Sequence, residues 1–282
     1  MQKKTSRLNP SGRFAPSPSG LLHFGSLVTA MASYLDVKSE EGFWWLRIED
    51  IDKQRSRKDM TKIIKSQLID HGLSWDKWPE LPKENDGIIF QSQRGKIYSQ
   101  FLHSVISSGR AFSCKCTRKT IFKHSTRTNC LKSGELRYPG TCRNNKYNKI
   151  SQVRTIRLVS SNIDDFVLKR INDNAFSYAF AVVIDDYLQN ITNVVRGDDL
   201  KFTVERNMQL QSFFGFPLQK ILHVPVVKDF NGNKLSKQRN EGELRGGKYI
   251  KNQITKSWNY LQKNMPTEWV EKVADTFSKN FL

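Results

Sequence analysis

Residues 13–26, which read RFAPSPSGLLHFGS, contain the signals for a strand end, a loop and a helix start. Arg13-Phe14-Ala15 predicts the end of a first strand, and the segment from Pro16 to Gly20 predicts a stiff, turn-rich loop. From Ser26 onward, apolar residues recur at helical spacing. In open parallel sheets, ligands bind at the carboxyl ends of strands, near helix amino termini. We therefore expect a binding site in this loop.

The next elements extend this pattern. The segment 43–48 is a short apolar run of strand formers that ends in Glu49-Asp50-Ile51-Asp52. Apolar spacing predicts one helix around residues 60–68, which Gly72 would end, and another around 97–106, which Gly109 would end. The order strand, helix, strand, helix indicates an α/β fold with a parallel sheet and crossover helices.

The later part of the chain continues the alternation after a basic segment without a clear period. Residues 181–184 predict a buried strand, residues 204–214 a helix and residues 223–227 a further strand. Asn231-Gly232 predicts a tight turn. Two amphipathic helices, near 250–261 and 267–277, follow in the tail. The domain boundaries that we expect are 1–110 and 149–238 for the two halves of the catalytic domain, 111–148 for an insertion, and 239–282 for a C-terminal helical segment.

The charge of the chain points to a polyanionic partner. Its 282 residues include 46 Lys and Arg against 27 Asp and Glu, a formal net charge of +19, and nucleic acid is the commonest partner of such proteins. Three stretches concentrate this charge: 53–65, 110–127 and 143–157. The alternative is a lysine-rich proteome that raises charge everywhere. No run approaches the ~18 apolar residues of a membrane helix, and residues 1–10 lack a signal-peptide core, so we expect a cytoplasmic protein without a membrane partner.

Two separate loops carry residues that suit a nucleotide. Backbone N–H groups at the helix start near Ser26 would attract phosphate. His23 can donate a hydrogen bond to a phosphate oxygen, and Gly25 lets a nucleotide base approach the backbone. In the second loop, Lys234 and Lys237 flank Ser236 and can neutralise charge that builds up on a triphosphate. Each loop alone is a weak signal, because such residues are common on surfaces.

The four cysteines all lie in one short segment. They are Cys114, Cys116, Cys130 and Cys142. Clustering in a large chain indicates metal binding in preference to disulfides, and thiolates suit tetrahedral zinc. From the residues alone, all four cysteines would be taken as ligands, with buried thiols without a metal as the alternative.

Together, the two loops resemble the HIGH-type motif (His23 to Ser26) and the KMSKS-type motif (Lys234 to Gln238) of class I aminoacyl-tRNA synthetases. The flanking segments 13–20, 47–52 and 195–200 resemble the glutamyl-tRNA synthetase group. Phe24, Ser26 and Gln238 depart from the usual motifs. Only 44 residues follow Gln238 (282 minus 238), too few for a large anticodon-binding region. This short tail, the segment 91–94 and the Cys-x-Cys insertion are similar to the glutamyl-Q tRNA(Asp) synthetase family.

The resemblance implies a Rossmann-type catalytic domain that uses ATP with Mg²⁺, L-glutamate and tRNA(Asp) carrying queuosine, and that carries a structural zinc. It implies catalytic roles for His23 and Lys237, and a cytoplasmic, monomeric enzyme is expected. Further residues are implied by position. The implied ATP-binding residues are His23, Gly25, Ser26, Lys234, Ser236 and Lys237. The implied glutamate-binding residues are Arg13, Phe14, Ala15, Pro16, Ser17, Glu49, Tyr178 and Arg196.

For the metal, the resemblance implies Tyr138 as the fourth ligand with Cys114, Cys116 and Cys142, which leaves Cys130 as a spare thiol; His124 is a less suitable substitute. For the function, the expected reaction forms glutamyl adenylate and transfers glutamate to queuosine at the wobble position of tRNA(Asp). The alternatives are a shortened glutamyl-tRNA synthetase that charges the 3′ end of tRNA(Glu), a non-catalytic RNA-binding paralogue, and an adenylyltransferase on the same fold.

Overall fold

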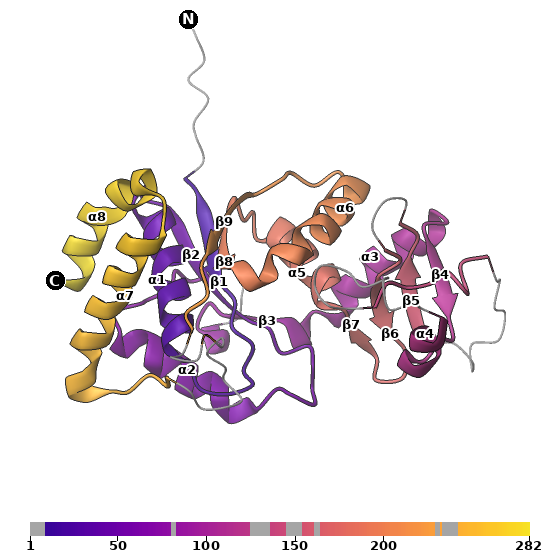
Figure 1. Cartoon of the computed structure of the whole chain (residues 1–282), viewed down its shortest axis with the longest axis horizontal. Helices are drawn as coiled ribbons and strands as arrows, with labels where there is room; N and C mark the ends of the chain where they lie inside the picture. Colours follow the sequence, from indigo (N-terminus) through magenta and orange to yellow (C-terminus); the bar gives the residue numbers. More distant parts are fainter. Residues whose placement is uncertain are drawn as a thin grey trace, which may run out of the picture. The chain divides into compact units, whose positions relative to one another are not determined.

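A computed structural model describes residues 9–79, 83–124, 136–144, 154–160, 164–228, 232 and 242–282 (Figure 1). The chain forms two compact units. The first comprises Met1–Gln91, Asn190–Lys201 and Leu218–Leu282, and the second comprises Ser92–Gln189 and Phe202–Pro217. Among the described residues, no helix is long and apolar enough to cross a membrane.

The first unit is built on parallel strands. They are β1 (Ser11–Phe14), β2 (Phe43–Ile48), β3 (Ile89–Phe90), β8 (Asn193–Gly197) and β9 (Lys220–Val224). The pairs β1–β2, β2–β3 and β8–β9 are all parallel. The N–H of Thr192 donates to the carbonyl of Ser11 at 2.9 Å, and this bond ties the start of β8 to β1. The strands hydrogen-bond as the sheet β1-β2-β3 and the pair β8-β9, and we refer to these five strands together as the parallel sheet. The predicted parallel pairing is therefore confirmed.

Four helices of the first unit share one apolar core with these strands. They are α1 (Phe24–Lys38), α2 (Lys58–Asp70), α7 (Ile250–Asn264) and α8 (Thr267–Phe281), with short 3-10 turns at Lys83–Asn85, Gln91–Gln93, Asp198–Thr203 and Gly247–Tyr249. The predicted helix starting near Ser26 is α1, and the two predicted tail helices are α7 and α8. Gly72 follows the end of α2 with a φ of +75°, a backbone conformation that glycine adopts without strain.

The two faces of this sheet differ in chemistry. Side chains alternate along each strand, and those of Trp44, Leu46 and Val195 enter the large apolar core that also contains α1. The intervening positions hold Trp45 and Val194, which form a separate cluster. This alternation places Arg13, Arg47 and Arg196 on the face away from α1.

A buried carboxylate joins α8 to the core of the first unit. Asp36 of α1 is only 6% exposed. It accepts hydrogen bonds from Asn193 Nδ2 at 2.8 Å and from Trp269 Nε1 at 2.9 Å, and Lys272 Nζ lies 3.3 Å away. Since these donors come from β8 and α8, one side chain connects α1, the sheet and the C-terminal helix.

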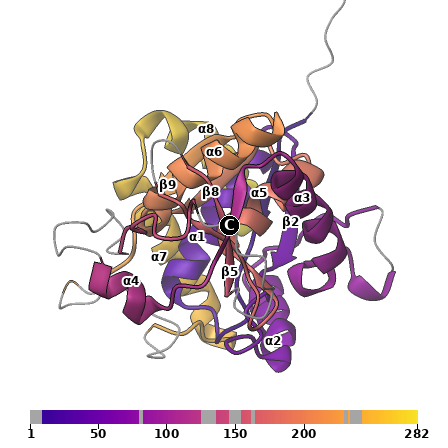
Figure 2. The same cartoon turned by 90° about the vertical axis from the view of Figure 1, so that its right-hand side faces the viewer.

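The second unit contains an antiparallel sheet and helices. Its elements are α3 (Gly95–Ser107), β4 (Ala111–Cys114), α4 (Arg118–His124), β5 (Thr155–Leu158), β6 (Val167–Arg170), β7 (Ala175–Phe176), α5 (Tyr178–Leu188) and α6 (Val204–Phe214). The strands pair antiparallel in the order β4-β5-β6-β7. In both views, α3 and α4 lie on opposite sides of β5 (Figure 1, Figure 2).

The strand predicted at 181–184 is wrong, because these residues belong to the helix α5. Residues Phe180 to Ile184 are all at most 2% exposed, so this helix is apolar on every side there. A helix buried all round shows no 3.6-residue period, and a short apolar run cannot then be distinguished from a buried strand. The antiparallel sheet was not predicted either, because its strands are only two to four residues long.

Candidate active site

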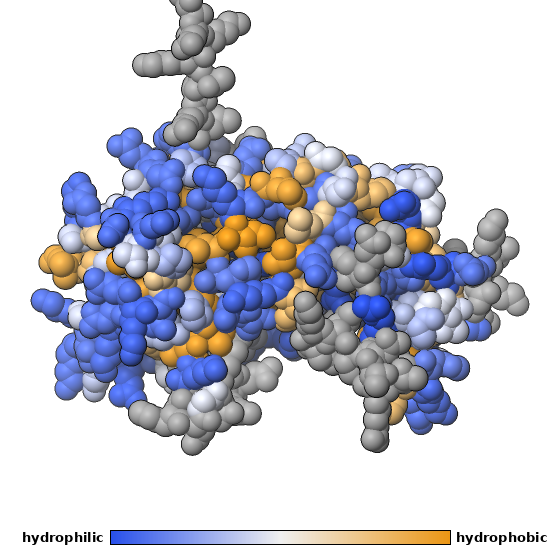
Figure 3. Space-filling model, turned by 45° about the horizontal axis from the view of Figure 1, so that its top comes forward, coloured by the Kyte–Doolittle hydropathy of each residue, from blue (hydrophilic) through white to orange (hydrophobic). Residues whose placement is uncertain are grey.

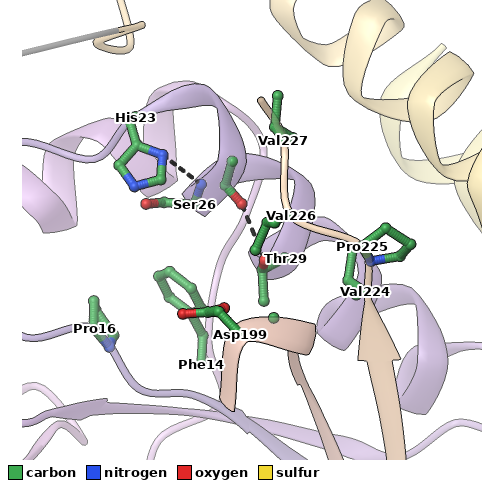
Figure 4. Close-up of a pocket in the computed structure, with 12 residues that line it drawn as sticks. Phe14, Pro16, His23, Ser26, Thr29, Asp199, Val224, Pro225, Val226 and Val227 are labelled. Carbon is green, nitrogen blue, oxygen red and sulfur yellow. Dashed lines mark hydrogen bonds between the residues drawn. The ribbon is translucent and has the colours of Figure 1, made fainter. Parts of the chain in front are cut away.

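A cavity of about 170 Å³ opens at the carboxyl ends of three parallel strands in the first unit. Phe14, Gly197 and Val224, the last residues of β1, β8 and β9, all line it. The other lining residues are Pro16, His23, Gly25, Ser26, Thr29, Asp199, Pro225, Val226 and Val227 (Figure 4). This is the position at which open parallel sheets bind their ligands.

His23 is the residue that begins α1. Its backbone is extended, and its Nδ1 accepts a hydrogen bond from the N–H of Ser26 at 3.2 Å (Figure 4). A neutral ring that accepts at Nδ1 carries its hydrogen on Nε2. The Nε2–H group is therefore a donor on a cavity-lining ring at a helix amino terminus, where the helix dipole also favours negative charge.

Two glycines allow side chains to lie close to this cavity wall. A Cβ atom at Gly25 would lie 3.1 Å from Cε1 of the His23 ring, so glycine gives the ring room beside the helix. A Cβ atom at Gly197 would overlap Oδ1 of Asp199. Glycine at position 197 therefore lets the Asp199 carboxylate reach the cavity lining.

Three arginines lie on the sheet face away from α1, and all are buried. Arg13, Arg47 and Arg196 are 4%, 0% and 5% exposed. Arg47 Nη2 lies 3.4 Å from Glu49 Oε1, and the Glu49 N–H donates to the carbonyl of Pro16 at 3.1 Å, which ties the end of β2 to the loop after β1. Guanidinium groups pair with carboxylates in a two-bond geometry, so this face suits a carboxylate ligand.

The sequence did not single out His223, Arg47 or Asp199. His223 of β9 is in register with Arg196 of β8. Burial, and then the charge of Arg196, lower the pKa of His223, which favours the neutral ring. Its Nε2 is buried and makes no hydrogen bond within the described part of the chain. Alternation within the apolar run 43–48 could have exposed Arg47, whereas the position of His223 needed the strand register.

The structure gathers many of the predicted site residues in the first unit. The nucleotide candidates His23, Gly25 and Ser26 line the cavity with Phe14 and Pro16. Ala15 and Ser17 lie in the same loop, while Arg13, Glu49 and Arg196 belong to or follow strands of the same sheet. Tyr178 is the first residue of α5 in the second unit. The predicted Lys234, Ser236 and Lys237 lie outside the described residues, as does Cys130.

In the second unit, three cysteines and a tyrosine form a compact buried group. The sulfur atoms of Cys114, Cys116 and Cys142 lie within 4.8 Å of one another. Oη of Tyr138 lies 3.3 Å from Cys114 Sγ and 3.9 Å from Cys116 Sγ, and Cys116 Sγ lies 3.6 Å from Cys142 Sγ. Tetrahedral zinc with bonds of ~2.3 Å places its sulfur ligands roughly 3.8 Å apart, so the four atoms fit such an ion. His124 is exposed at the end of α4 and is not among these atoms.

The surroundings hold Tyr138 in this group. Its hydroxyl accepts from the N–H of Cys142 at 2.9 Å, and its own N–H donates to Asp164 Oδ1 at 2.9 Å. The Arg157 guanidinium lies 4.1 Å from the centre of the ring. Burial raises the pKa of Cys116 to about 12 and also raises the pKa of Tyr138, so without a cation both groups stay protonated near neutral pH.

Comparisons with known proteins agree with this geometry. The model of the class I tRNA synthetases (E and Q), catalytic domain, matches residues 11–155 and 147–267. The relative from Albidiferax ferrireducens, a glutamyl-Q tRNA(Asp) synthetase, is 37% identical and covers 80% of this chain and 84% of its own. The relative of the same name from Thiobacillus denitrificans is 38% identical, and the match covers 82% of this chain and 79% of the relative.

A solved structure of a glutamate tRNA ligase from Elizabethkingia meningosepticum, in complex with its amino acid, superimposes with a TM-score of 0.67 at 25% identity. It is matched over 83% of this chain, which spans about half (53%) of the ligase. A parallel sheet with a cavity at its carboxyl edge and His23 at the first helix fits the class I synthetase catalytic domain that the family model identifies. The chain belongs to the class I tRNA synthetases (E and Q), among the glutamyl-Q tRNA(Asp) synthetases. The predicted family is confirmed.

Proposed function

We propose that the chain activates L-glutamate with ATP and transfers it to the queuosine base at the wobble position of tRNA(Asp). The observation that carries this proposal is the pairing of two features in one unit. His23 lines a cavity at the carboxyl ends of the strands. Arg13, Arg47 and Arg196 are buried on the face of these strands away from α1. The names of the relatives supply the amino acid and the acceptor.

In the first step, the α-carboxylate of glutamate attacks the α-phosphate of ATP. A new bond forms between the carboxylate oxygen and phosphorus, and the bond to the leaving pyrophosphate breaks. His23 Nε2–H donates to a phosphate oxygen, and Lys237, with Lys234 and Ser236 in the same loop, neutralises the triphosphate charge. Mg²⁺ bound with ATP would add to this neutralisation. Gly25 and Ser26 form the helix start that receives the phosphates.

The glutamate itself needs partners for two carboxylates and one ammonium group. We assign Arg13 and Arg196 to the carboxylates, because guanidinium groups pair with carboxylates in a two-bond geometry. Glu49 is assigned to the ammonium group. Further contacts to glutamate are assigned to Phe14, Ala15, Pro16, Ser17 and Tyr178.

In the second step, a hydroxyl on the queuosine cyclopentene ring attacks the activated carbonyl. A new ester bond forms and AMP leaves. AMP is a good leaving group, so positioning of the hydroxyl beside the adenylate supplies much of the rate.

We also propose that Cys114, Cys116, Tyr138 and Cys142 hold a structural zinc ion. The spacing of the four ligand atoms and their burial support this assignment. Zinc would hold the turn after Tyr138 against β4. Metal analysis of the purified protein should give about one zinc per chain, and Cys142→Ser should lose the metal and lower the melting temperature. Full zinc in Cys142→Ser would refute the assignment, and Cys130→Ser is the matched control that keeps the ion.

Labelled glutamate tests the reaction. The enzyme with ATP is given tRNA(Asp) that carries or lacks queuosine, and each tRNA is also prepared without its terminal 3′ adenosine. Removal of the adenosine is used in place of periodate oxidation, because periodate would also cleave the cis-diol of queuosine. We expect labelling that requires queuosine and survives removal of the terminal adenosine.

Two alternative functions are tested by adding tRNA(Glu) to this assay and by measuring pyrophosphate exchange. A shortened glutamyl-tRNA synthetase would label tRNA(Glu) and would lose labelling when the terminal adenosine is removed. A non-catalytic RNA-binding paralogue would show no glutamate-dependent exchange of pyrophosphate into ATP. Either result would overturn the proposal.

We further propose the domain arrangement 1–110 and 149–238 for the catalytic halves, 111–148 for the zinc insertion and 239–282 for the helical tail. The α7 and α8 helices support the last of these boundaries. The monomeric state and the cytoplasmic location stay predictions, and gel filtration with light scattering tests the first.

A further inference from the structure

The helix α7 and the residues just before it form the most one-sided charge distribution of the first unit's tail. From Arg245 to Asn264 the chain has five basic residues and no acidic one. The next helix, α8, differs sharply, because Glu268, Glu271 and Asp275 accompany its two lysines. The positive charge is therefore a property of α7 and not of the whole tail.

Part of this charge lies on the exposed side of α7. Ser257, Trp258 and Leu261 are buried and face the core. At 100° per residue, the opposite positions between Asn252 and Lys263 lie within an arc of roughly 100° and extend for roughly 16 Å along the axis. All of these positions are exposed: Asn252, Thr255, Lys256, Asn259 and Lys263. Lys248, also exposed, lies just before α7 in the 3-10 turn Gly247–Tyr249. We call these six residues the α7 stripe. Figure 3 shows that the side of the molecule holding α7 and α8 in Figure 1 is largely hydrophilic.

Two stripe lysines differ from the ion-paired surface lysines of the first unit. Lys77 pairs with Asp86 at 3.2 Å, and Lys279 pairs with Asp275 at 2.6 Å. Within the described residues, Lys256 and Lys263 form no ion pair. Uncompensated lysines on one helix face do not help the helix fold, since like charges along a face repel one another. Lysine, asparagine and threonine are instead the residues that contact nucleic-acid phosphates and sugars.

Contacts within the first unit attach α7 to the wall of the nucleotide cavity. The Tyr260 hydroxyl lies 3.2 Å from the carbonyl of Pro225 and 3.3 Å from that of Val226, both cavity-lining residues. The segment before α7 is held as well, because the N–H of Phe24 donates to the carbonyl of Gly242 at 2.8 Å. A strand bridge joins His23 to Glu243. The stripe is therefore fixed to the site that would activate glutamate.

We propose that the α7 stripe binds the sugar–phosphate backbone of the tRNA. This inference rests on the proposed function for the identity of the RNA. The contact is electrostatic and does not read the modified base, so the stripe serves to hold the tRNA while the reactive nucleoside enters the active site. The alternative is a solvated lysine-rich face that does not bind tRNA, and the experiment must distinguish the two.

The test compares two double variants with equal loss of charge. Lys256→Gln/Lys263→Gln removes two stripe charges, and Lys77→Gln/Lys279→Gln removes two ion-paired surface charges. Binding of an unmodified tRNA(Asp) transcript is measured for the full chain over a range of salt concentrations. The logarithm of the binding constant falls linearly with the logarithm of the salt concentration, and each lost phosphate contact makes this slope shallower by ~0.7 or more. The slope of the stripe variant should therefore be shallower by roughly 1.4, and the variant should bind roughly 25-fold more weakly at about 0.1 M salt. The control pair should stay within about twofold of the parent.

Glutamate-dependent pyrophosphate exchange and the unfolding midpoint are measured for the same proteins, and both should be unchanged. Equal weakening in the two pairs, or no weakening in the stripe pair, would overturn the proposal. Loss of RNA binding in the stripe pair alone supports it even if the parent shows no exchange with glutamate. In that last case the proposed function fails while the RNA-binding surface stands, so the two failures are distinguishable.

Discussion

Substitution of His23 can separate its structural contribution from its chemical one. His23 Nδ1 accepts from the Ser26 N–H at 3.2 Å, but the His23 carbonyl also accepts from this group at 2.8 Å. Loss of the side-chain cap therefore leaves one partner in place, and His23→Ala should cost about 0.5 to 1 kcal/mol, the lower part of the range for helix caps. Asn is among the best capping residues, so His23→Asn should restore most of that stability.

The catalytic consequence should not follow the stability. The shorter Asn side chain fills the cap but does not reach as far as His23 Nε2, so both variants should lose about 10²–10³ in the rate of glutamate-dependent pyrophosphate exchange, as when one charge-stabilising donor is removed. Urea unfolding gives the stability and exchange of labelled pyrophosphate gives the rate. If His23→Asn recovers the parental exchange rate together with the parental stability, then His23 only caps α1 and the reasoning fails.

Three further predictions concern named contacts. Asp36→Ala should lower the unfolding free energy by about 2–4 kcal/mol, because buried donors lose their acceptor; a smaller loss than in Asp36→Asn, measured in urea, would contradict this. His71 has a pKa lowered by burial from the ordinary 6.5, so the unfolded chain takes up that proton first and stability should fall as the pH drops below about 6.5; His71→Gln should make this slope shallower. Gly197→Ala should displace the Asp199 carboxylate and raise the KM for ATP. A Cβ atom at Gly95 would have no atom within 4 Å, so the control Gly95→Ala should leave this KM unchanged.

The sequence predicted the first unit well because its signals are local. The loop from Pro16 to Gly20 and the glycine at position 72 each mark a boundary through their own backbone preferences. The periodicity of α1 was equally readable from its apolar spacing. The error at 181–184 has the opposite cause, since residues 180–184 of α5 are all buried and burial removes the polar positions that reveal a helical period.

The site was predicted less completely than the fold. His23, Gly25 and Ser26 stood out because they form one short motif, and the structure places them on one cavity wall. Arg47 was missed although the alternation within 43–48 could have exposed it, whereas the position of His223 depends on the pairing of β8 with β9. A single sequence gives no register between such segments.

The alternation of the sheet explains how one short strand can serve both stability and chemistry. In β1, Phe14 enters the apolar core, while the neighbouring Arg13 is buried on the opposite face. In β8, Val195 and Arg196 repeat this division. Because successive side chains point to opposite faces, a shift of either strand by one residue would bury an arginine in the apolar core and withdraw it from the ligand. The same hydrophobic residues that stabilise the first unit therefore fix the register that brings Arg13 and Arg196 to one face. We predict that an apolar substitution at Val195 that loosened this register would weaken the proposed binding of glutamate, although Val195 is not assigned to the ligand.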